Sequence, residues 1–339
     1  MSAIGDDLDF VRENTELRAA NARLQRANAR LKEKQADLVE AVYTAAKDAA
    51  VAVGTPKPVP RPGRDRRRSP EVALLHVTDW QLGKHSESYS TAICEERVRL
   101  AVQKTIKLAE IQRADHPVRE VHVALGGDLV ENVTIFPGQV WEVDSNAFSQ
   151  VFAAAALVEQ VIVSLLAAFE SVTVWEVSGN HGRIGRKGDS PREDNLDRIV
   201  GRIARERLTT FDKRLTWEPP AGWYSVMEVG AYRALLVHGD QVKSWGGNTP
   251  VHGLLKKANA WSSGAIPEQF QDLYLGHLHQ PMTFQMANGG LVYMTPSTES
   301  GSAYAREFMA AHGRPGQRLH FIDPARARVT AEYLLWLDE

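Results

Sequence analysis

The chain has 339 residues, of which 43% are hydrophobic and 24% are charged, so it carries enough apolar material for a folded core and is not disordered throughout. At roughly 150 residues per domain, this length predicts about two domains. The net charge of −2 excludes a uniformly basic chain. It would argue against a nucleic-acid partner only if the charges were evenly spread along the sequence.

Cysteine content and apolar runs bear on the compartment. Cys94 is the single cysteine and cannot form an internal disulfide, and the acidic N-terminus lacks the pattern of a signal peptide. No uninterrupted run of 18 or more apolar residues is present. We therefore expect a cytoplasmic protein with no membrane partner.

Residues 1–50 are expected to form a helical arm, because they hold good helix formers and no proline. Four leucines recur every seven residues, as in the seam of a coiled coil: Leu17, Leu24, Leu31 and Leu38. The other seam positions would hold Asn and Gln, or small Ala residues, which weakens such a seam. The arm is therefore predicted to form a homodimer by coiled-coil pairing, and the alternative is a helix that packs on its own domain.

Residues 51–70 form a linker rich in proline and arginine. Its six basic residues and one acidic residue give a net charge of +5, and residues 71–339 carry −6. Such a segment either binds phosphates or serves as a solvated tether. The near-neutral total is thus a sum of unlike parts and does not exclude nucleic acid.

Residues 71–339 are expected to form one α/β (α+β) domain. In chain order the pattern predicts a strand at 71–79, a helix at 94–114, a strand at 119–125, a helix at 146–169, a strand at 171–177 and a helix at 191–208. Ser190 and Pro191 are the expected N-cap and first residue of that last helix. A strand-rich half follows, with strands at 222–229, 232–238, 271–275, 282–287, 290–295, 318–323 and 327–336 and a helix at 250–262. This order predicts two sheets packed face to face with helices outside.

Metal-binding side chains follow five of the predicted strands. They are Asp79, Asp128, Asn180 with His181, His238, and His277 with His279. Because ligands bind at the carboxyl ends of strands in open α/β sheets, we expect these groups to meet at one edge. Mixed nitrogen and oxygen donors suit Mn, Fe or Zn better than Mg or Ca. Glycines precede Asp128, Asn180 and His277 and are expected to permit sharp turns there.

The order of these motifs resembles the calcineurin-like metallophosphoesterase superfamily, over residues 72 to about 300. The resemblance implies a four-layer αββα sandwich and two divalent metal ions, for which we favour Mn, with Fe, Zn or Mg as alternatives. It implies a first metal held by Asp79, Gln81, Asp128 and His279. It implies a second metal held by Asp128, Asn180, His238 and His277. It further implies that a metal-bridging hydroxide attacks phosphorus and that His181 contacts the scissile phosphate and protonates the leaving oxygen.

One position departs from the family pattern, because Gln81 stands where the family has histidine. A neutral amide oxygen is a harder donor than imidazole, so we expect weaker occupancy of the first metal or a shift toward Mn or Mg. His85 is an alternative donor, although Leu82 and Gly83 match the family's next two residues and favour Gln81.

The sequence GGDLVEN at 126–132 is similar to the second motif of SbcD-type DNA repair exonucleases, as is the Asp-x-x-Leu-Gly pattern that starts at Asp79. Glu131 stands where those nucleases carry a histidine. With the basic linker and the dimerising arm, this favours a metal-dependent nuclease with DNA as its substrate, and both exonuclease and endonuclease action stay open. The alternatives are a phosphatase or phosphodiesterase that acts on small molecules or phosphoproteins, and a scaffold without turnover.

Basic and aromatic residues near the predicted site complete the hypotheses. Arg183 is expected to hold a nonbridging phosphate oxygen, which makes it a candidate catalytic group beside His181 and Asp128, whereas Arg186 and Lys187 are expected to be solvated. Among the tryptophans, Trp80 is expected to pack beneath the site and Trp175 in the core. Trp141 and Trp245 lie in loops where they could stack on a base. Cys94 is expected to pack as a small apolar residue.

Overall fold

The computed structural model describes residues 18, 22–30, 37, 40–45, 47–49, 52, 69–185, 187–211, 213–220, 222–242, 250–299 and 313–338. The chain divides into two compact units, Met1–Ala49 and Ala50–Glu339. In the first unit, residues 22–30 and 40–45 are helical, and Leu24 is 61% exposed. Leu17, Leu31 and Leu38 lie outside the described residues, as does the linker over 53–68. The coiled coil, the homodimer and the role of the linker therefore stay predictions.

The second unit is built on a six-stranded sheet with the order β11-β10-β1-β2-β3-β4. Its strands are β1 (Glu71–Val77), β2 (Val118–Leu125), β3 (Ser171–Glu176), β4 (Leu215–Glu218), β10 (Gly316–Asp323) and β11 (Arg328–Trp336). The first four run parallel to one another, whereas β10 pairs antiparallel with β1 and β11 antiparallel with β10. All residues of β1 are buried, as expected of a strand that is covered on both faces.

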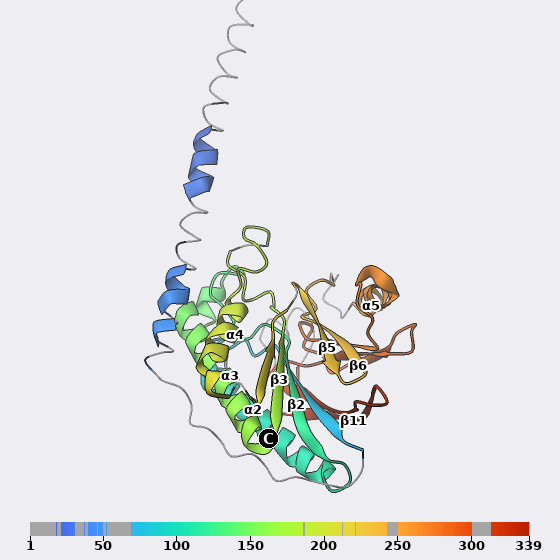
Figure 1. The fold of residues 1–339 in the computed structure, drawn as a ribbon. Helices are drawn as coiled ribbons and strands as arrows, with labels where there is room; N and C mark the ends of the chain where they lie inside the picture. Colours follow the sequence, from blue (N-terminus) through green and yellow to red (C-terminus); the bar gives the residue numbers. More distant parts are fainter. Residues whose placement is uncertain are drawn as a thin grey trace, which may run out of the picture. The chain divides into compact units, whose positions relative to one another are not determined.

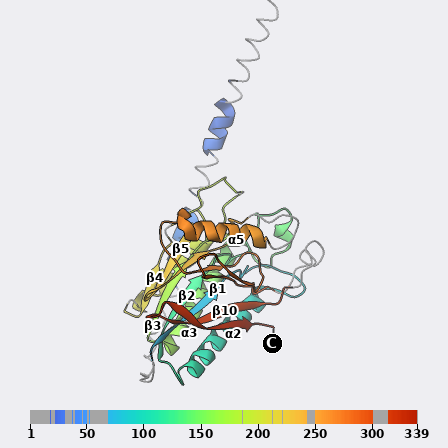
Figure 2. The same cartoon turned by 90° about the vertical axis from the view of Figure 1, so that its right-hand side faces the viewer.

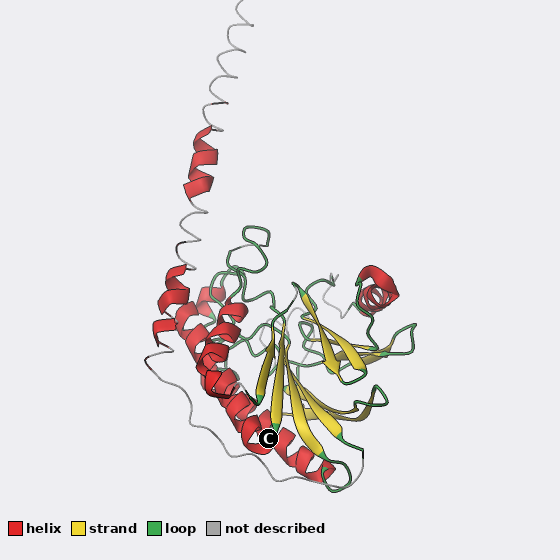
Figure 3. Cartoon of the chain, viewed as in Figure 1, coloured by secondary structure: helices red, strands yellow, loops and turns green. Residues whose placement is uncertain are grey.

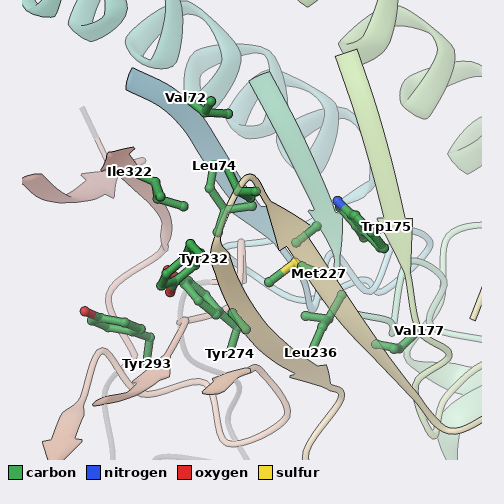
Figure 4. Packing of buried hydrophobic residues seen from close by; sticks show 13 residues of the cluster. Val72, Leu74, Trp175, Val177, Met227, Tyr232, Leu236, Tyr274, Tyr293 and Ile322 are labelled. Atoms are coloured by element: carbon green, nitrogen blue, oxygen red, sulfur yellow. The ribbon is translucent and has the colours of Figure 1, made fainter. Parts of the chain in front are cut away.

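A five-stranded sheet with the order β5-β6-β7-β9-β8 lies against the first. Its strands are β5 (Tyr224–Val229), β6 (Tyr232–Val237), β7 (Asp272–Leu275), β8 (Thr283–Gln285) and β9 (Leu291–Met294). The core between the sheets joins Val72 and Leu74 of β1 to Tyr232 of β6 and Tyr274 of β7 (Figure 4). Side chains that alternate along each strand fill this layer.

Helices cover the outer faces of both sheets. The helices α2 (Thr91–Gln112), α3 (Ala147–Ala168) and α4 (Leu196–Arg207) lie along the first sheet (Figure 1 and Figure 3). The helix α5 (Val251–Ala260) covers the second sheet, where Leu254 and Ala258 pack on buried residues of β6, β7 and β9 (Figure 2). Short helical turns are η1 (Gln139–Trp141), η2 (Thr209–Phe211) and η3 (Trp261–Ala265). This arrangement confirms the predicted four-layer αββα sandwich.

One helix among the described residues, α3, is long and apolar enough to cross a membrane by length and composition. The helix itself was predicted at 146–169, but the search for uninterrupted apolar runs did not single it out as long and apolar enough to span a membrane. Half of its most apolar window is buried inside the fold, where α3 packs against α2, α4 and β3. The helix thus uses its apolar surface in the core of the second unit.

One prediction of local structure is wrong, and one strand was not predicted. The helix predicted from Pro191 begins at Leu196, with Asn195 and not Ser190 as its N-cap. The Asn195 side chain accepts a hydrogen bond from the Asp197 amide (2.9 Å) and donates one to the Gly179 carbonyl (2.9 Å), so contacts distant in sequence fix the start of α4. The short strand β4 was not predicted, because its pairing with β3 depends on tertiary contact and not on a local pattern.

Candidate metal centre

Five of the seven predicted ligands adopt an uncommon backbone conformation. Positive φ angles occur at Asp79 (53°), Gln81 (44°), Asp128 (52°), His277 (64°) and His279 (54°). Non-glycine residues adopt this region rarely, and such strain concentrates at functional sites. The conformation turns these side chains back over the carboxyl edge of the two sheets.

The glycines predicted at these turns serve two different purposes. Gly127 has a positive φ of 87°, as a sharp turn requires. Gly179 and Gly276 have ordinary φ angles, but a Cβ at either would lie 2.0 Å from a carboxylate oxygen of Asp128 or Asp79, respectively. Both are therefore needed for close approach, and the prediction of a sharp turn is wrong for these two.

One half of the cluster is formed by Asp128, His238, His277 and Asn180. The potential ligand atoms of Asp128, His238 and His277 all lie within 4.8 Å of one another. The Nε2 atom of His238 is 3.0 Å from Oδ2 of Asp128 and 3.1 Å from Oδ1 of Asn180. The Nδ1 atom of His238 is 2.8 Å from the Gly126 carbonyl, which can accept its proton and leave Nε2 as the donor toward a metal.

The other half is formed by Asp79, Gln81 and His279. The Nε2 atom of His279 lies 3.2 Å from Oδ1 of Asp79 and 3.5 Å from Nε2 of Gln81. Oε1 of Gln81 is buried and has no hydrogen-bond partner among the residues that the structure describes, and the buried Oδ1 of Asp79 is met there by His279 without a well-aligned hydrogen bond. Buried polar atoms without partners are costly, and a bound cation would satisfy both. The residues present therefore fit a metal ion.

His85, the alternative ligand for the first metal position, lies in different surroundings from Gln81. His85 is exposed, whereas the Gln81 side chain is buried at 2% exposure among the other groups. The backbone amide of Gln81 is anchored by a 2.9 Å hydrogen bond to the Asp128 carbonyl, which links the first two motifs directly. This geometry favours Gln81 over His85.

Charges within the cluster shift its protonation. Burial opposes protonation of His238, but Asp128 and Asp79 raise the pKa of His238 to about 10. Burial, and then the charge of His238, lower the pKa of His277 to about 4. Because a metal ion binds the neutral imidazole, loading of a cation beside His238 releases a proton.

His181 lies at the border of the cluster and is oriented by Glu131. Its Nδ1 atom is 3.1 Å from Oε2 of Glu131 and 3.1 Å from the Glu131 carbonyl oxygen. Its Nε2 atom faces the cluster, at 3.4 Å from Nε2 of Gln81 and 3.9 Å from Oδ2 of Asp128. The backbone amide of His181 donates to Oδ1 of Asp128 (2.7 Å). Glu131, noted in the sequence only as a departure from a similar motif, is thus the partner of this imidazole.

Two supporting residues were not predicted. The buried carboxylate of Asp197 accepts three backbone hydrogen bonds, from Asp128 (2.9 Å), Leu129 (3.0 Å) and Gly179 (2.8 Å). The side-chain amide of Asn132 donates to the carbonyls of His181 (2.8 Å) and Arg183 (2.9 Å). Together they fix two loops that carry predicted ligands. No signal in the sequence distinguishes Asp197, which falls inside the helix predicted over 191–208.

The basic residues near the cluster differ in their placement. Arg183 is half-buried, and its Nε has no hydrogen-bond partner among the described residues. Lys187 is exposed, and Arg186 lies outside the described residues.

The burial predicted for two tryptophans and the cysteine is confirmed. Trp80 and Cys94 are 0% exposed and Trp175 is 9% exposed, so neither tryptophan offers a ring face to a substrate. Trp141 is 87% exposed, and Trp245 lies outside the described residues.

Comparisons with known proteins give no family assignment. No protein-family model and no curated protein matches the chain. Solved structures with a similar fold include Vps29 from Entamoeba histolytica complexed with Zn²⁺, at 12% identity and a TM-score of 0.34, covering 78% of this chain and 99% of that one. Another is a predicted phosphoesterase from Streptococcus pneumoniae (12% identity, TM-score 0.32, 78% and 98% coverage). A third is the phosphopantetheinyl hydrolase of Mycobacterium tuberculosis (11% identity, TM-score 0.31, 68% and 91% coverage). We therefore argue function from the residues of the site.

Proposed function

We propose that this chain is a phosphoesterase that depends on two divalent cations and hydrolyses the phosphodiester bonds of DNA. The observation that carries the proposal is that the predicted ligands meet at one sheet edge, next to His181. The Nδ1 atom of His181, on the side of the ring away from the ligands, is held by the carboxylate of Glu131. Such a constellation combines metal binding with a positioned proton donor, as phosphoester hydrolysis requires.

The donor set divides between two cations that share Asp128. One would be held by Asp79, Gln81, Asp128 and His279, and the other by Asp128, Asn180, His238 and His277. Mixed imidazole, amide and carboxylate donors favour Mn²⁺, with Fe, Zn or Mg as alternatives. When bound, the cations supply Lewis-acid activation of water and neutralise charge on the phosphoryl group.

The remaining roles fall to residues beside the ligands. Burial lowers the pKa of His181, but the charges of Asp128 and Glu131 raise it to about 9, which favours the protonated imidazole. We assign His181 Nε2 as the donor of that proton to the leaving oxygen, with Glu131 holding Nδ1. Arg183, whose Nε has no partner among the described residues, is assigned to a nonbridging phosphate oxygen.

Support for DNA as the substrate comes from the linker and from one motif of the site. The linker carries a net charge of +5 beside an acidic domain, and the segment GGDLVEN resembles the second motif of SbcD-type nucleases. A dimeric arm would place two such domains on one polymer and raise the effective concentration of each. The alternative is a phosphatase or phosphodiesterase for small molecules or phosphoproteins.

Purified full-length protein with Mn²⁺ should be incubated with linear DNA, circular DNA, a generic phosphomonoester and a generic phosphodiester. We expect DNA cleavage that a chelator abolishes and that the His181→Ala variant, purified in parallel, lacks. That variant exposes any contaminating nuclease. Turnover of the monoester without cleavage of DNA would rule out the nuclease and favour the phosphatase.

A further inference from the structure

Large apolar side chains are exposed on the segment between β2 and α3, beside the candidate centre. Phe136 is 46% exposed, Val140 54% and Trp141 87%. The ring of Phe136 lies 5.1 Å from the ring of His181. Three large exposed apolar residues within six positions of one segment are a candidate interaction site, whereas single exposed apolar residues need no explanation.

The position of Phe136 is fixed from inside the segment by Gln139. The Gln139 side chain is buried, and its Oε1 accepts hydrogen bonds from the amides of Ile135 (2.7 Å) and Phe136 (3.3 Å). Its Nε2 donates to the carbonyl of Glu131 (2.8 Å) and to Oε1 of the same residue (2.8 Å). One amide group thus holds both Phe136 and the carboxylate that orients His181.

The exposure of Trp141 follows from the same contact. Gln139 begins the short helix η1 and is buried, whereas Val140 and Trp141, which complete η1, are exposed. Just beyond Trp141, the Glu142 carbonyl accepts a 2.7 Å hydrogen bond from the His85 amide, which follows the first motif. The segment is therefore tied at both ends to loops of the centre. A platform held in place in this way loses little conformational entropy on binding.

We propose that Phe136 and Trp141 form a stacking platform for an unpaired nucleobase attached to the leaving oxygen. This rests on the proposed function, in which the leaving oxygen lies at Nε2 of His181. Phe136 contacts that same imidazole. The nucleoside that carries the leaving oxygen would therefore lie next to the ring of Phe136. Aromatic side chains bind bases in a sequence-tolerant way by stacking on their flat faces. A base inside a duplex has no free face, so the substrate is single-stranded or frayed at the cleaved position.

The test uses full-length protein and two short single strands, a thymidine oligomer and an oligomer of equal length with abasic residues. With Mn²⁺, we expect kcat/KM to be about tenfold higher for the thymidine oligomer, as the stacking of one base implies. Phe136→Leu keeps the apolar bulk and removes the flat ring, so it should bring the ratio of the two values toward one, and Trp141→Ala should lower it. Ile111→Ala, a matched control at a 58% exposed apolar residue on α2, should keep the ratio.

Binding of the same oligomers, followed by fluorescence anisotropy without Mn²⁺, separates this inference from the proposed function. Base-dependent binding without hydrolysis of either oligomer would support the platform and rule out the proposed hydrolysis of DNA. Equal binding of the two oligomers by the unmodified protein would overturn the platform. If Phe136 only shields His181 from water, Phe136→Leu will change hydrolysis of both oligomers equally, and that result would also overturn it.

Discussion

Glu131 approaches His181 twice at the same ring nitrogen, since both its carboxylate Oε2 and its carbonyl oxygen lie 3.1 Å from Nδ1. Two acceptors at Nδ1 hold the proton there and orient the ring. The second nitrogen, Nε2, is then directed at the ligand cluster. Under the proposed function, this pairing determines how well His181 donates a proton to the leaving oxygen.

Glu131→Gln should lower kcat for DNA by about 10- to 100-fold, the usual effect of losing an orienting partner. His181→Ala should cost about 10²- to 10⁴-fold, as expected for loss of a general acid. Both losses should be smaller for an aryl phosphodiester, whose leaving group needs no proton. Steady-state rates on the two substrates test this, with Glu142→Gln at an exposed position as the control. Equal losses on both substrates would show that the pair does not act in proton transfer.

Gln81→Ala should remove one ligand from the first metal position and reduce bound Mn²⁺ from two ions toward one per chain. Gln81→His supplies imidazole and should tighten binding at this position without loss of turnover. Equilibrium dialysis followed by metal analysis measures both effects. His85→Ala is the control, because that side chain is exposed. If His85→Ala releases the metal and Gln81→Ala does not, the assignment of the ligand is wrong.

The sequence was sufficient to predict the layers of the fold because its strongest signals are long. The apolar run of β1 and the long helices α2 and α3 follow from burial and composition. The meeting of Asp79, Asp128 and Asn180 at one edge also follows, since parallel strands present their carboxyl ends together. The general rule that ligands bind at the carboxyl ends of strands was therefore enough to predict which residues form the candidate centre.

Features that depend on contacts distant in sequence could not be predicted. In the sequence, Asp197 is an ordinary acidic residue inside the helix predicted over 191–208, yet it accepts three backbone hydrogen bonds from two separate loops. The start of α4 was misplaced because Asn195 is selected by its bond to Gly179 and not by local helix preference. The position of Phe136 beside His181 likewise depends on the folded path of the segment that Gln139 holds.

Asp197→Asn should destabilise the second unit by about 1–3 kcal/mol. The asparagine amide has one acceptor oxygen where the carboxylate has two, and its NH₂ group would face backbone N–H donors. It should also weaken Mn²⁺ binding, since the loops that carry Asp128 and Asn180 lose their common anchor. Urea unfolding and dialysis measure the two effects. Glu193→Gln, at an exposed position before α4, is the control. An unchanged unfolding free energy would show that Asp197 does not anchor these loops.

Deletion of residues 1–50 should convert a dimer to a monomer, as measured by light scattering, if the leucine repeat pairs two chains. A point variant gives a sharper test. Leu24→Lys places a charge in the repeat and should reduce the mass in the same way, whereas Ala29→Lys, outside the repeat, should leave it unchanged. A monomeric full-length chain would contradict the coiled coil and favour a helix that packs on its own domain.

Glu176→Gln should raise the unfolding free energy at alkaline pH. Glu176 ends β3, where Trp217 donates to its Oε2 (3.1 Å), and burial raises the pKa of this carboxyl from 4.5 to about 7. The folded state therefore holds the proton more tightly than the unfolded chain, so stability from this group is complete below pH 4.5 and is lost as the pH rises to 7. We expect a gain of about 1–3 kcal/mol at pH 8 and a smaller one at pH 5, from urea unfolding. The control Glu120→Gln, at an exposed position on β2, should show no difference in stability gain between the two pH values. An equal gain at both pH values for Glu176→Gln would refute the titration of Glu176.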